Sequence, residues 1–306
     1  MTALNDRQQQ ILDTLVASGL GQEEEPGLAT LLRDTLESGL GPIVQTLPPG
    51  ERLWASKYDI QEALTCEAGF AARKQEPFEW TPATARGTLI HRAIERSILG
   101  TNHLSPLDLA EQAAQYFIEN DVKRGLGEAL SDMSDDGRHD LLRDVADAVT
   151  KFEADWPQID RRSIPRTEMT LKVSLVAGRA ILQAKVDFAL GVAQGNRRGS
   201  KLVEFKSGLP HAHHRDELVF YALLETLVRS IAPAQIALYY PDLGFLDALQ
   251  VSTEMLITEV GRVIQGAEHI CRASTLPFDE LKTTGNPSCA WCPLKSSCPD
   301  STATGH

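Results

Sequence analysis

Apolar residues in the first third of the chain recur every three or four positions, which is the spacing of amphipathic helices. The pattern predicts one helix over Asp6–Leu20 and a second over Gly27–Leu40, separated by the acidic break Glu23–Pro26. The segment Gly41–Gly50, with three prolines, is typical of a linker. A third helix is expected over Ser56–Arg73, because its first residue has a side chain suited to an N-cap.

The helical period resumes after a predicted turn at Thr81–Arg86, with a helix over Gly87–Leu99 and mostly helical structure across residues 107–155. After Pro165 the chain changes to short runs with the period-two pattern of strands. The predicted strands are Thr170–Val176, Arg179–Leu190, Lys201–Lys206, Gln235–Tyr240 and Phe245–Val251, and the helices among and after them are His214–Ser230 and Thr253–Ala273. The sequence therefore predicts a mixed α/β fold with a mostly antiparallel or mixed sheet.

Charge is distributed unevenly along this pattern. The 306 residues include 30 Lys and Arg against 42 Asp and Glu, for a formal net charge of -12. Residues 1–50 have two basic and seven acidic side chains, and residues 107–155 have five basic and thirteen acidic ones. Those segments contribute -5 and -8, which leaves +1 for the rest of the chain. The acidic total argues against general attraction to nucleic acid, but a locally positive groove is compatible with it.

The same composition excludes several classes of protein. A hydrophobic content of 42% and a charged content of 24% are those of an ordinary globular protein. No apolar run approaches the length of a membrane span, and the first residues show no basic region followed by an apolar one. Five cysteines are too few for a disulfide framework. We therefore expect a cytoplasmic protein without membrane contact, with thiols free for metal or cluster chemistry.

Two acidic residues interrupt otherwise apolar strands. If Leu190 lies opposite Lys201 in a hairpin, Asp187 lies opposite Glu204, with Cβ atoms about 5 Å apart. Facing carboxylates destabilise a sheet unless a positive charge separates them, and a divalent cation prefers such oxygen ligands. The alternative is a solvent-facing side of the sheet, although aspartate is depleted within strands.

Cysteine spacing gives a second signal. Cys289, Cys292 and Cys298 form a C-x2-C-x5-C pattern near the C-terminus, and Cys66 lies far upstream. Four thiolates satisfy a tetrahedral zinc ion or an iron–sulfur cluster, and the competing interpretation is a chance cysteine-rich tail. Cys271, within a predicted helix, is interpreted as a small buried apolar residue.

Together, these residues resemble a known series of motifs. Gly87–Glu95 with His91, then Asp187, then Leu202–Gly208, then Glu217–Tyr221 resemble the motifs of RecB-type nucleases in the PD-(D/E)XK superfamily. The four cysteines are similar to those of the iron–sulfur branch, which includes the AddB nuclease domain and CRISPR-associated exonucleases. The resemblance implies a restriction-endonuclease-like core, with a mixed central sheet flanked by helices. It also implies a nuclease domain over residues 51–306, with a helical insertion at about 100–160 and a C-terminal iron–sulfur clasp. Residues 1–50 would form a helical N-terminal extension.

The resemblance also implies roles for individual residues. His91, Asp187 and Glu204, with the Phe205 backbone carbonyl, would bind Mn2+ or Mg2+, and Lys206 would lie beside the attacking water and the phosphate. An imidazole ligand favours manganese over magnesium. The cluster would be a 4Fe–4S cluster on Cys66, Cys289, Cys292 and Cys298, with zinc as the competing occupant.

Other residues are weaker candidates. Glu217, Tyr221 and Arg86 are candidate substrate contacts, although the family usually has glutamine at position 217 and a carboxylate there could repel phosphate. His91 could instead pair with Glu95 on a helix surface. Five cations are interpreted as plain surface residues rather than phosphate contacts: Lys57, Arg73, Lys74, Arg197 and Arg198. A histidine-rich turn contains His211, His213, His214 and Arg215, and Glu168 is a candidate supporting acid.

The function expected from all of this is metal-dependent hydrolysis of DNA, as an exonuclease on single strands or DNA ends, in repair, recombination or defence. No G-x-x-x-x-G-K-[ST] motif of an ATP-driven motor is present in the sequence. Two alternatives stay open. One is a nuclease subunit that is active only with a helicase or another recombination or defence partner, and the other is a DNA-end-binding or scaffold protein with weak or no catalysis.

Overall fold

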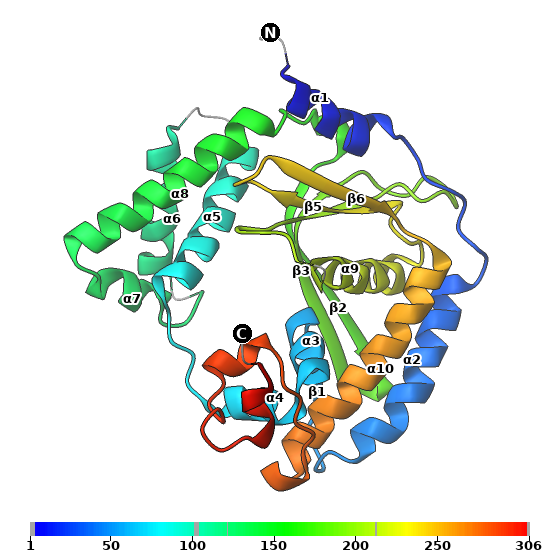
Figure 1. Cartoon of the computed structure of the whole chain (residues 1–306). Coiled ribbons are helices and arrows are strands. Elements are labelled where there is room, and N and C mark those ends of the chain that lie inside the picture. The colour runs from blue at the N-terminus through cyan, green and yellow to red at the C-terminus, as the bar shows by residue number, and fades with distance from the viewer. Residues whose placement is uncertain (1–3, 101–103, 121, 212, 305–306) are drawn as a thin grey trace.

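The computed structural model describes residues 4–100, 104–120, 122–211 and 213–304, with the side chains of residues 213 and 302–304 left out of the description. Its centre is a six-stranded mixed sheet with helices on both faces (Figure 1). The strands are β1 (Leu53–Ala55), β2 (Arg166–Leu175), β3 (Ala180–Leu190), β4 (Lys201–Phe205), β5 (Gln235–Tyr240) and β6 (Phe245–Gln250). This confirms the mixed α/β fold with a flanked central sheet.

The sheet has the order β1-β3-β4-β5-β6, and β2 pairs with β3 outside this path. β1 with β3 and β4 with β5 are parallel pairs, while the other pairs are antiparallel. Leu190 lies opposite Lys201, which confirms the predicted hairpin register. Gly191 begins the β3–β4 connection with a φ of +67°, and a Cβ there would meet the carbonyl oxygen of Gly199 at 2.6 Å, so the turn requires glycine.

One edge of β3 is only partly paired. β2 follows the opposite edge over nearly its whole length. On this edge, β1 pairs with residues 180–182 and β4 pairs with residues 188–190. None of the described strands pairs with residues 183–187 there. The opening between β1 and β4 leaves room for side chains from helices, and Asp187 lies at its border with β4.

The strand faces also change at this point. In a regular strand, the even-numbered residues from 182 to 190 would share one face. Instead, Leu182 and Val186 belong to one hydrophobic core, whereas Phe188 and Leu190 belong to the other. Opposite Asp187 in the β2 register, Glu168 has a φ of +53°, a left-handed conformation that is uncommon for a residue with a side chain. This backbone irregularity accompanies the change of face, which periodicity alone does not predict.

The first core lies between one face of the sheet and a layer of helices. These helices are α2 (Leu28–Gln45), α3 (Lys57–Thr65), α4 (Glu67–Gln75), α9 (His213–Arg229) and α10 (Thr253–Thr275). α2 contributes a stripe of leucines at every fourth position, Leu28, Leu32, Leu36 and Leu40, all at most 3% exposed. Figure 1 shows α2 and α10 side by side along this layer, and the two helices pack against each other.

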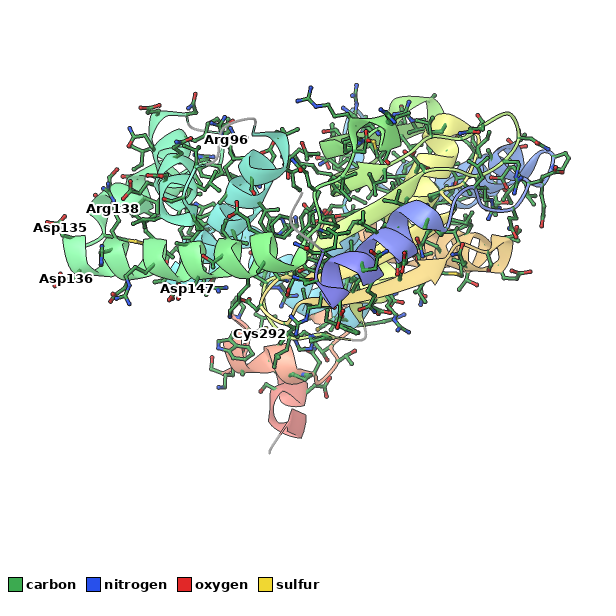
Figure 2. The ribbon with its side chains drawn as sticks, turned by 90° about the horizontal axis from the view of Figure 1, so that it is seen from above. Arg96, Asp135, Asp136, Arg138, Asp147 and Cys292 are labelled. Carbon is green, nitrogen blue, oxygen red and sulfur yellow. The ribbon has the colours of Figure 1, made fainter. Side chains whose placement is uncertain are left out.

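The second core lies on the other face, under α1 (Asp6–Leu12), α5 (Pro82–Leu99), α6 (Pro106–Glu119), α7 (Leu126–Asp132) and α8 (Asp135–Asp155). An aromatic cluster joins α8 to three strands: Phe152 and Trp156 pack with Phe188, Phe205 and Tyr239, with ring centroids 5.0–6.3 Å apart. The acidic side chains of α8, such as Asp135, Asp136 and Asp147, are exposed and lie along the outside of the helix (Figure 2). Much of the acidic charge of residues 107–155 therefore lies on a solvated helix face.

Several predicted boundaries were wrong. α2 continues through Pro42 to Gln45, so the first part of the expected linker is helical. The expected turn at Thr81–Arg86 is the first turn of α5, because Thr81 forms the N-cap and Pro82 occupies the first helical position. Ser56 is an N-cap, as predicted, but its helix ends at Thr65, and Cys66 separates it from α4. The short strand β1 was not predicted.

Among the described residues, no helix is both long and apolar enough for a bilayer crossing.

Candidate active site

The opening on the β3 edge is filled by charged side chains from four elements. Asp187 comes from β3, Glu204 and Lys206 from β4 and the residue after it, Glu217 from α9, and Lys57 from the first position of α3. β1 directs the start of α3 into the opening, because its parallel pairing with β3 ends two residues before Lys57. The site is therefore built by the strand gap and by the two helices that close it.

Four of these side chains form a closed ring of ion pairs. The Lys57 ammonium contacts Glu204 Oε1 and lies 2.9 Å from Glu217 Oε2. The Lys206 ammonium lies 2.6 Å from the same Glu217 oxygen and 3.4 Å from the same Glu204 oxygen. Lys57, Glu204 and Glu217 are each 4% exposed. Two positive and two negative charges thus balance each other in a largely dry environment.

The ring influences the ionisation of its members. Burial opposes the charged form of Lys57, but Glu204, Tyr221, Tyr58 and Glu217 together outweigh it and raise the pKa of Lys57. Burial likewise opposes ionisation of Glu217, yet the two ammonium groups lower the pKa of Glu217. Glu204 behaves differently, because burial and the nearby Asp187 carboxylate together raise its pKa despite both lysines.

His91 and Asp187 form a second pair beside the ring. His91 Nδ1 lies 3.1 Å from Asp187 Oδ1, and the Phe205 backbone N–H donates to Asp187 Oδ2 at 2.8 Å. Burial disfavours the Asp187 carboxylate, but His91 and the Phe205 N–H lower the pKa of Asp187 overall. Glu95, the alternative partner of His91, instead forms an ion pair with Arg92 at 2.6 Å. The helix-surface interpretation of His91 was therefore wrong.

The residues present fit a divalent cation, although the described part of the chain contains no three His, Cys, Asp or Glu side chains that already converge as a metal site. Glu204 Oε2 is buried and has no hydrogen-bond partner among the described residues. An orphaned carboxylate oxygen of this kind is costly unless a cation or a donor reaches it. The buried Glu204 and the partly buried Asp187 are acids that repel each other, and imidazole with carboxylate oxygens is a donor set for manganese or magnesium.

All four cysteines of the predicted set line one pocket. It is formed by the start of α4 and the segment 283–301, which Figure 1 shows beside each other. Cys66 Sγ accepts from the Gly69 N–H at 3.3 Å, and Cys289 Sγ accepts from the Asn286 N–H at 3.4 Å. Cys292 lies on the C-terminal segment, which projects from the body in the view of Figure 2. The topology thus brings together thiols that are more than 200 positions apart in sequence.

The fifth cysteine is separate from this pocket. Cys271 is buried in the first core on α10, and burial raises the pKa of its thiol to about 11. This confirms its interpretation as a small apolar residue.

Comparison with known proteins decides the family. The sequence matches the PD-(D/E)XK nuclease superfamily over residues 55–299. The chain belongs to this superfamily. A search of curated proteins finds no match. Among solved structures, it is similar to a putative exonuclease from Eubacterium rectale, with 9% identity, a TM-score of 0.46, and coverage of 84% of this chain and 89% of that one. It is also similar to SSO0001, with 14% identity, a TM-score of 0.28, and coverage of 80% of this chain and 95% of that one. With similarities this low, the assignment rests on the sequence match.

Sequence reasoning missed two residues of this PD-(D/E)XK nuclease. Lys57 was read as a surface cation, yet it is buried within the ion-pair ring. The ring of its neighbour Tyr58 is 4.7 Å from the Lys57 ammonium and 5.7 Å from that of Lys206, and 55% of Tyr58 is exposed. The sequence did contain one signal for Lys57: the Ser56 N-cap places Lys57 at the start of a helix. Only the pairing of β1 with β3 shows that this helix start lies at the site.

The other candidates have structural partners. Glu217 and Tyr221 lie one turn apart on α9, and both contact Lys57, whose ammonium lies 4.6 Å from the Tyr221 ring centroid. Arg198 is wholly buried, pairs with Glu24 at 2.6 Å and donates to the Val251 carbonyl, so the surface interpretation was wrong for this residue. Further pairs join cations to acids or carbonyls elsewhere: Arg73–Glu62, Lys74–Asp59, Arg86–Asp242, Lys185–Glu168, Arg197–Gly21 and Arg215–Asp247.

In the histidine-rich turn, His211 is exposed and His214 Nδ1 lies 2.9 Å from the Tyr240 hydroxyl. The His213 side chain lies outside the described part of the chain.

Proposed function

We propose that this nuclease hydrolyses phosphodiester bonds in DNA, with single strands or DNA ends as substrates and Mn2+ or Mg2+ as the cofactor. One observation carries the proposal. Glu204 has one oxygen held by the Lys206 and Lys57 ammonium groups, and its other oxygen is buried with no hydrogen-bond partner in the described part of the chain, beside the Asp187–His91 pair. A cation and a phosphate group would meet between these residues, and the superfamily match supports nuclease chemistry.

His91, Asp187 and Glu204, with the Phe205 carbonyl, would hold the cation. When bound, it neutralises phosphoryl charge and lowers the pKa of a coordinated water. Asp187 orients the imidazole through Nδ1, which leaves Nε2 as the nitrogen available for a ligand bond. Lys206 presents an ammonium 3.4 Å from Glu204 Oε1, where it can donate to a phosphate oxygen and stabilise charge that develops during hydrolysis.

Cleavage assays test this proposal. Anaerobically purified protein is incubated with end-labelled single- and double-stranded DNA and Mn2+, beside Lys206→Ala and Glu204→Gln. We expect both variants to lose activity by at least about 100-fold. Lys172→Ala is a matched control, because Lys172 is exposed on β2 and lies over the Trp54 ring. If wild type and Lys206→Ala bind DNA equally and neither cuts it, the DNA-end-binding scaffold is the better description.

A partner requirement is read from the same assay. Cleavage by the purified chain alone would exclude an obligatory helicase or other recombination or defence partner. Cleavage that begins only when a helicase is added would establish one.

We further propose that the nuclease is of the RecB type and that the four cysteines hold a 4Fe–4S cluster rather than zinc. The shared pocket and the backbone N–H groups that donate to Cys66 and Cys289 support a thiolate-bound group at this place, and the resemblance to the iron–sulfur branch favours the cluster over zinc. Iron and sulfide analysis with visible absorption distinguishes the two occupants. Cys292→Ala should lose the cluster and soluble yield together, whereas Cys271→Ala should keep the cluster. A colourless, stable and fully active Cys292→Ala protein would contradict this.

We also propose that residues 1–50 form an extension that caps a nuclease domain over residues 51–306, with residues 100–160 inserted into that domain. The leucine stripe of α2 against α10 supports the capping role. Deleting residues 1–50 should expose this core and lower the melting temperature.

A further inference from the structure

Lys57 is a charged side chain for which the proposed hydrolysis has no direct use. It is 4% exposed, and its ammonium lies between Glu204 and Glu217, above the ring of Tyr221. Burying an ammonium costs free energy unless the charge is paired. β1 and the start of α3 place this group beside its two carboxylate partners. Its location points to a role in the electrostatics of the site.

Glu217 explains why such a charge is needed. Its carboxylate lies 2.6 Å from the Lys206 ammonium, where it would neutralise the group that faces phosphate and would repel an anionic substrate. Lys57 shares the same Glu217 oxygen at 2.9 Å and the same Glu204 oxygen as Lys206. With Lys57 present, the two glutamates and two lysines of the ring sum to zero. Without it, one lysine would face two carboxylates.

The geometry also separates the two oxygens of Glu204. Both lysines bind Oε1, and Oε2 is left buried without a hydrogen-bond partner among the described residues. Lys57 therefore holds the Glu204 side chain by one oxygen, and it does so without occupying the other.

We propose that Lys57 is a positioning residue that neutralises Glu217, so that a carboxylate at position 217 is compatible with phosphate binding. This inference rests on the proposed metal-dependent nuclease function. Lys57 acts on the reaction through Glu217, Glu204 and Lys206.

A change in charge balance should change the affinities for Mn2+ and for DNA in opposite directions. Lys57→Met removes a positive charge next to the cation ligands, so Mn2+ should bind more tightly, by at least about tenfold, because charges a few ångströms apart interact strongly at an effective dielectric constant near 20. DNA should bind more weakly, and kcat/KM should fall at least about tenfold. Glu217→Gln makes the opposite change, with weaker Mn2+ binding and tighter DNA binding. A purely structural defect would weaken both ligands together.

The double variant Lys57→Met/Glu217→Gln restores the balance between the remaining Lys206 and Glu204. We expect its Mn2+ affinity to return to within about threefold of wild type and its DNA affinity to recover, because coupled sites show non-additive effects. Mn2+ affinity is measured by electron paramagnetic resonance of the free ion, DNA affinity by fluorescence anisotropy without metal, and folding by thermal melting. Lys172→Met is the matched control and should leave all of these unchanged.

The outcomes separate this inference from the proposed function. If Lys57→Met is folded and its Mn2+ affinity is unchanged or weaker, the inference is wrong, even when wild type cleaves DNA. If Lys57→Met does not fold, Glu217→Gln alone decides, and unchanged or tighter Mn2+ binding in that variant overturns the inference. If the affinities move as expected but no variant or wild type cuts DNA, the inference holds and the proposed catalytic function fails.

Discussion

Glu259 on α10 is a buried acid whose ionisation should make the stability of the protein depend on pH. It is 3% exposed, and Arg262 Nε lies 2.9 Å from its Oε2. Its Oε1 has no hydrogen-bond partner among the described residues. Burial raises the pKa of Glu259 to about 7, because the single partner Arg262 offsets only part of the desolvation. Arg262 also donates to Gln61 on α3, so this contact lies under the helix that carries Lys57.

The size and the sign of the effect follow from that pKa. The folded chain keeps the Glu259 proton up to about pH 7, whereas the unfolded chain releases it near pH 4.5. The contribution of Glu259 to stability is therefore complete below about pH 4.5 and is lost as the pH rises through 7. At 1.36 kcal/mol per pH unit, this window corresponds to roughly 3 kcal/mol.

Glu259→Gln keeps a neutral side chain at every pH. We expect the variant to match wild type in thermal stability near pH 4.5 and to exceed it at pH 8. Roughly 3 kcal/mol corresponds to about 6 °C in melting temperature for a chain of this size. The assay is thermal unfolding followed by circular dichroism at half-unit steps from pH 4.5 to 8.5, read as the difference between variant and wild type. Glu268→Gln is the matched control, since Glu268 is an exposed glutamate on the same helix.

Two results would refute this reasoning. Parallel melting curves for Glu259→Gln and wild type across the whole pH range would show that burial does not hold the proton. A variant that matches wild type near pH 4.5 but is less stable than wild type at pH 8 would show that Glu259 is stabilising as a carboxylate, through Arg262.

Three further predictions concern the core, the extension and the rim of the site. Phe152→Ala removes the ring that packs on Trp156, Phe205 and Tyr239, and it should lower the free energy of unfolding by about 3–5 kcal/mol. Urea titrations measure this loss, and a loss below about 1 kcal/mol would show that these rings do not tie α8 to the sheet. Arg198→Met leaves Glu24 buried without its guanidinium and should cost about 3–5 kcal/mol, and an unchanged melting temperature would mean that the pair contributes nothing. Tyr58→Ala should raise KM for single-stranded DNA at least about fivefold, because the exposed ring can no longer stack on a base. Tyr58→Phe keeps the ring and should stay near wild type. Equal effects of both changes would exclude stacking as the reason.

The features that follow from local patterns could be predicted well. The hairpin register rested on an alternating strand pair joined by a glycine-rich connection, and Leu190 does lie opposite Lys201. Periodicity gave both ends of β5 correctly, and it gave α10 with the correct start and an end two residues early. The approach of His91 to Asp187 was implied by the resemblance of the ordered motifs to a known family, and not by either residue alone.

The features that depend on long-range contacts could not be predicted. β1 has only three residues, and its pairing with β3 adds a strand that no period reveals. Arg198 looks like half of an exposed Arg–Arg pair in sequence, but Glu24, 174 positions away, makes its burial tolerable. Lys57 was misread for the same reason. A charge is placed inside a protein by partners that lie elsewhere in the chain, and those partners have no fixed spacing from it.

The helix α3 connects the ion-pair ring to the cysteine pocket, and the unpredicted strand β1 sets the position of this helix. β1 directs α3 into the opening, Lys57 is the first residue of α3, and Cys66 follows its last residue. At 1.5 Å per residue, this nine-residue helix is about 13 Å long, and a helix of that length transmits a displacement rather than absorbing it. A group that binds Cys66 would therefore fix one end of α3 while the Lys57 ion pairs fix the other. The four sulfur ligands would then act on the site through helix position, with no contact to substrate. The break at Cys66 fits this arrangement, since a continuous helix over Ser56–Arg73 would place the thiol on a helix side, whereas the N-cap position turns its sulfur toward the α4 backbone.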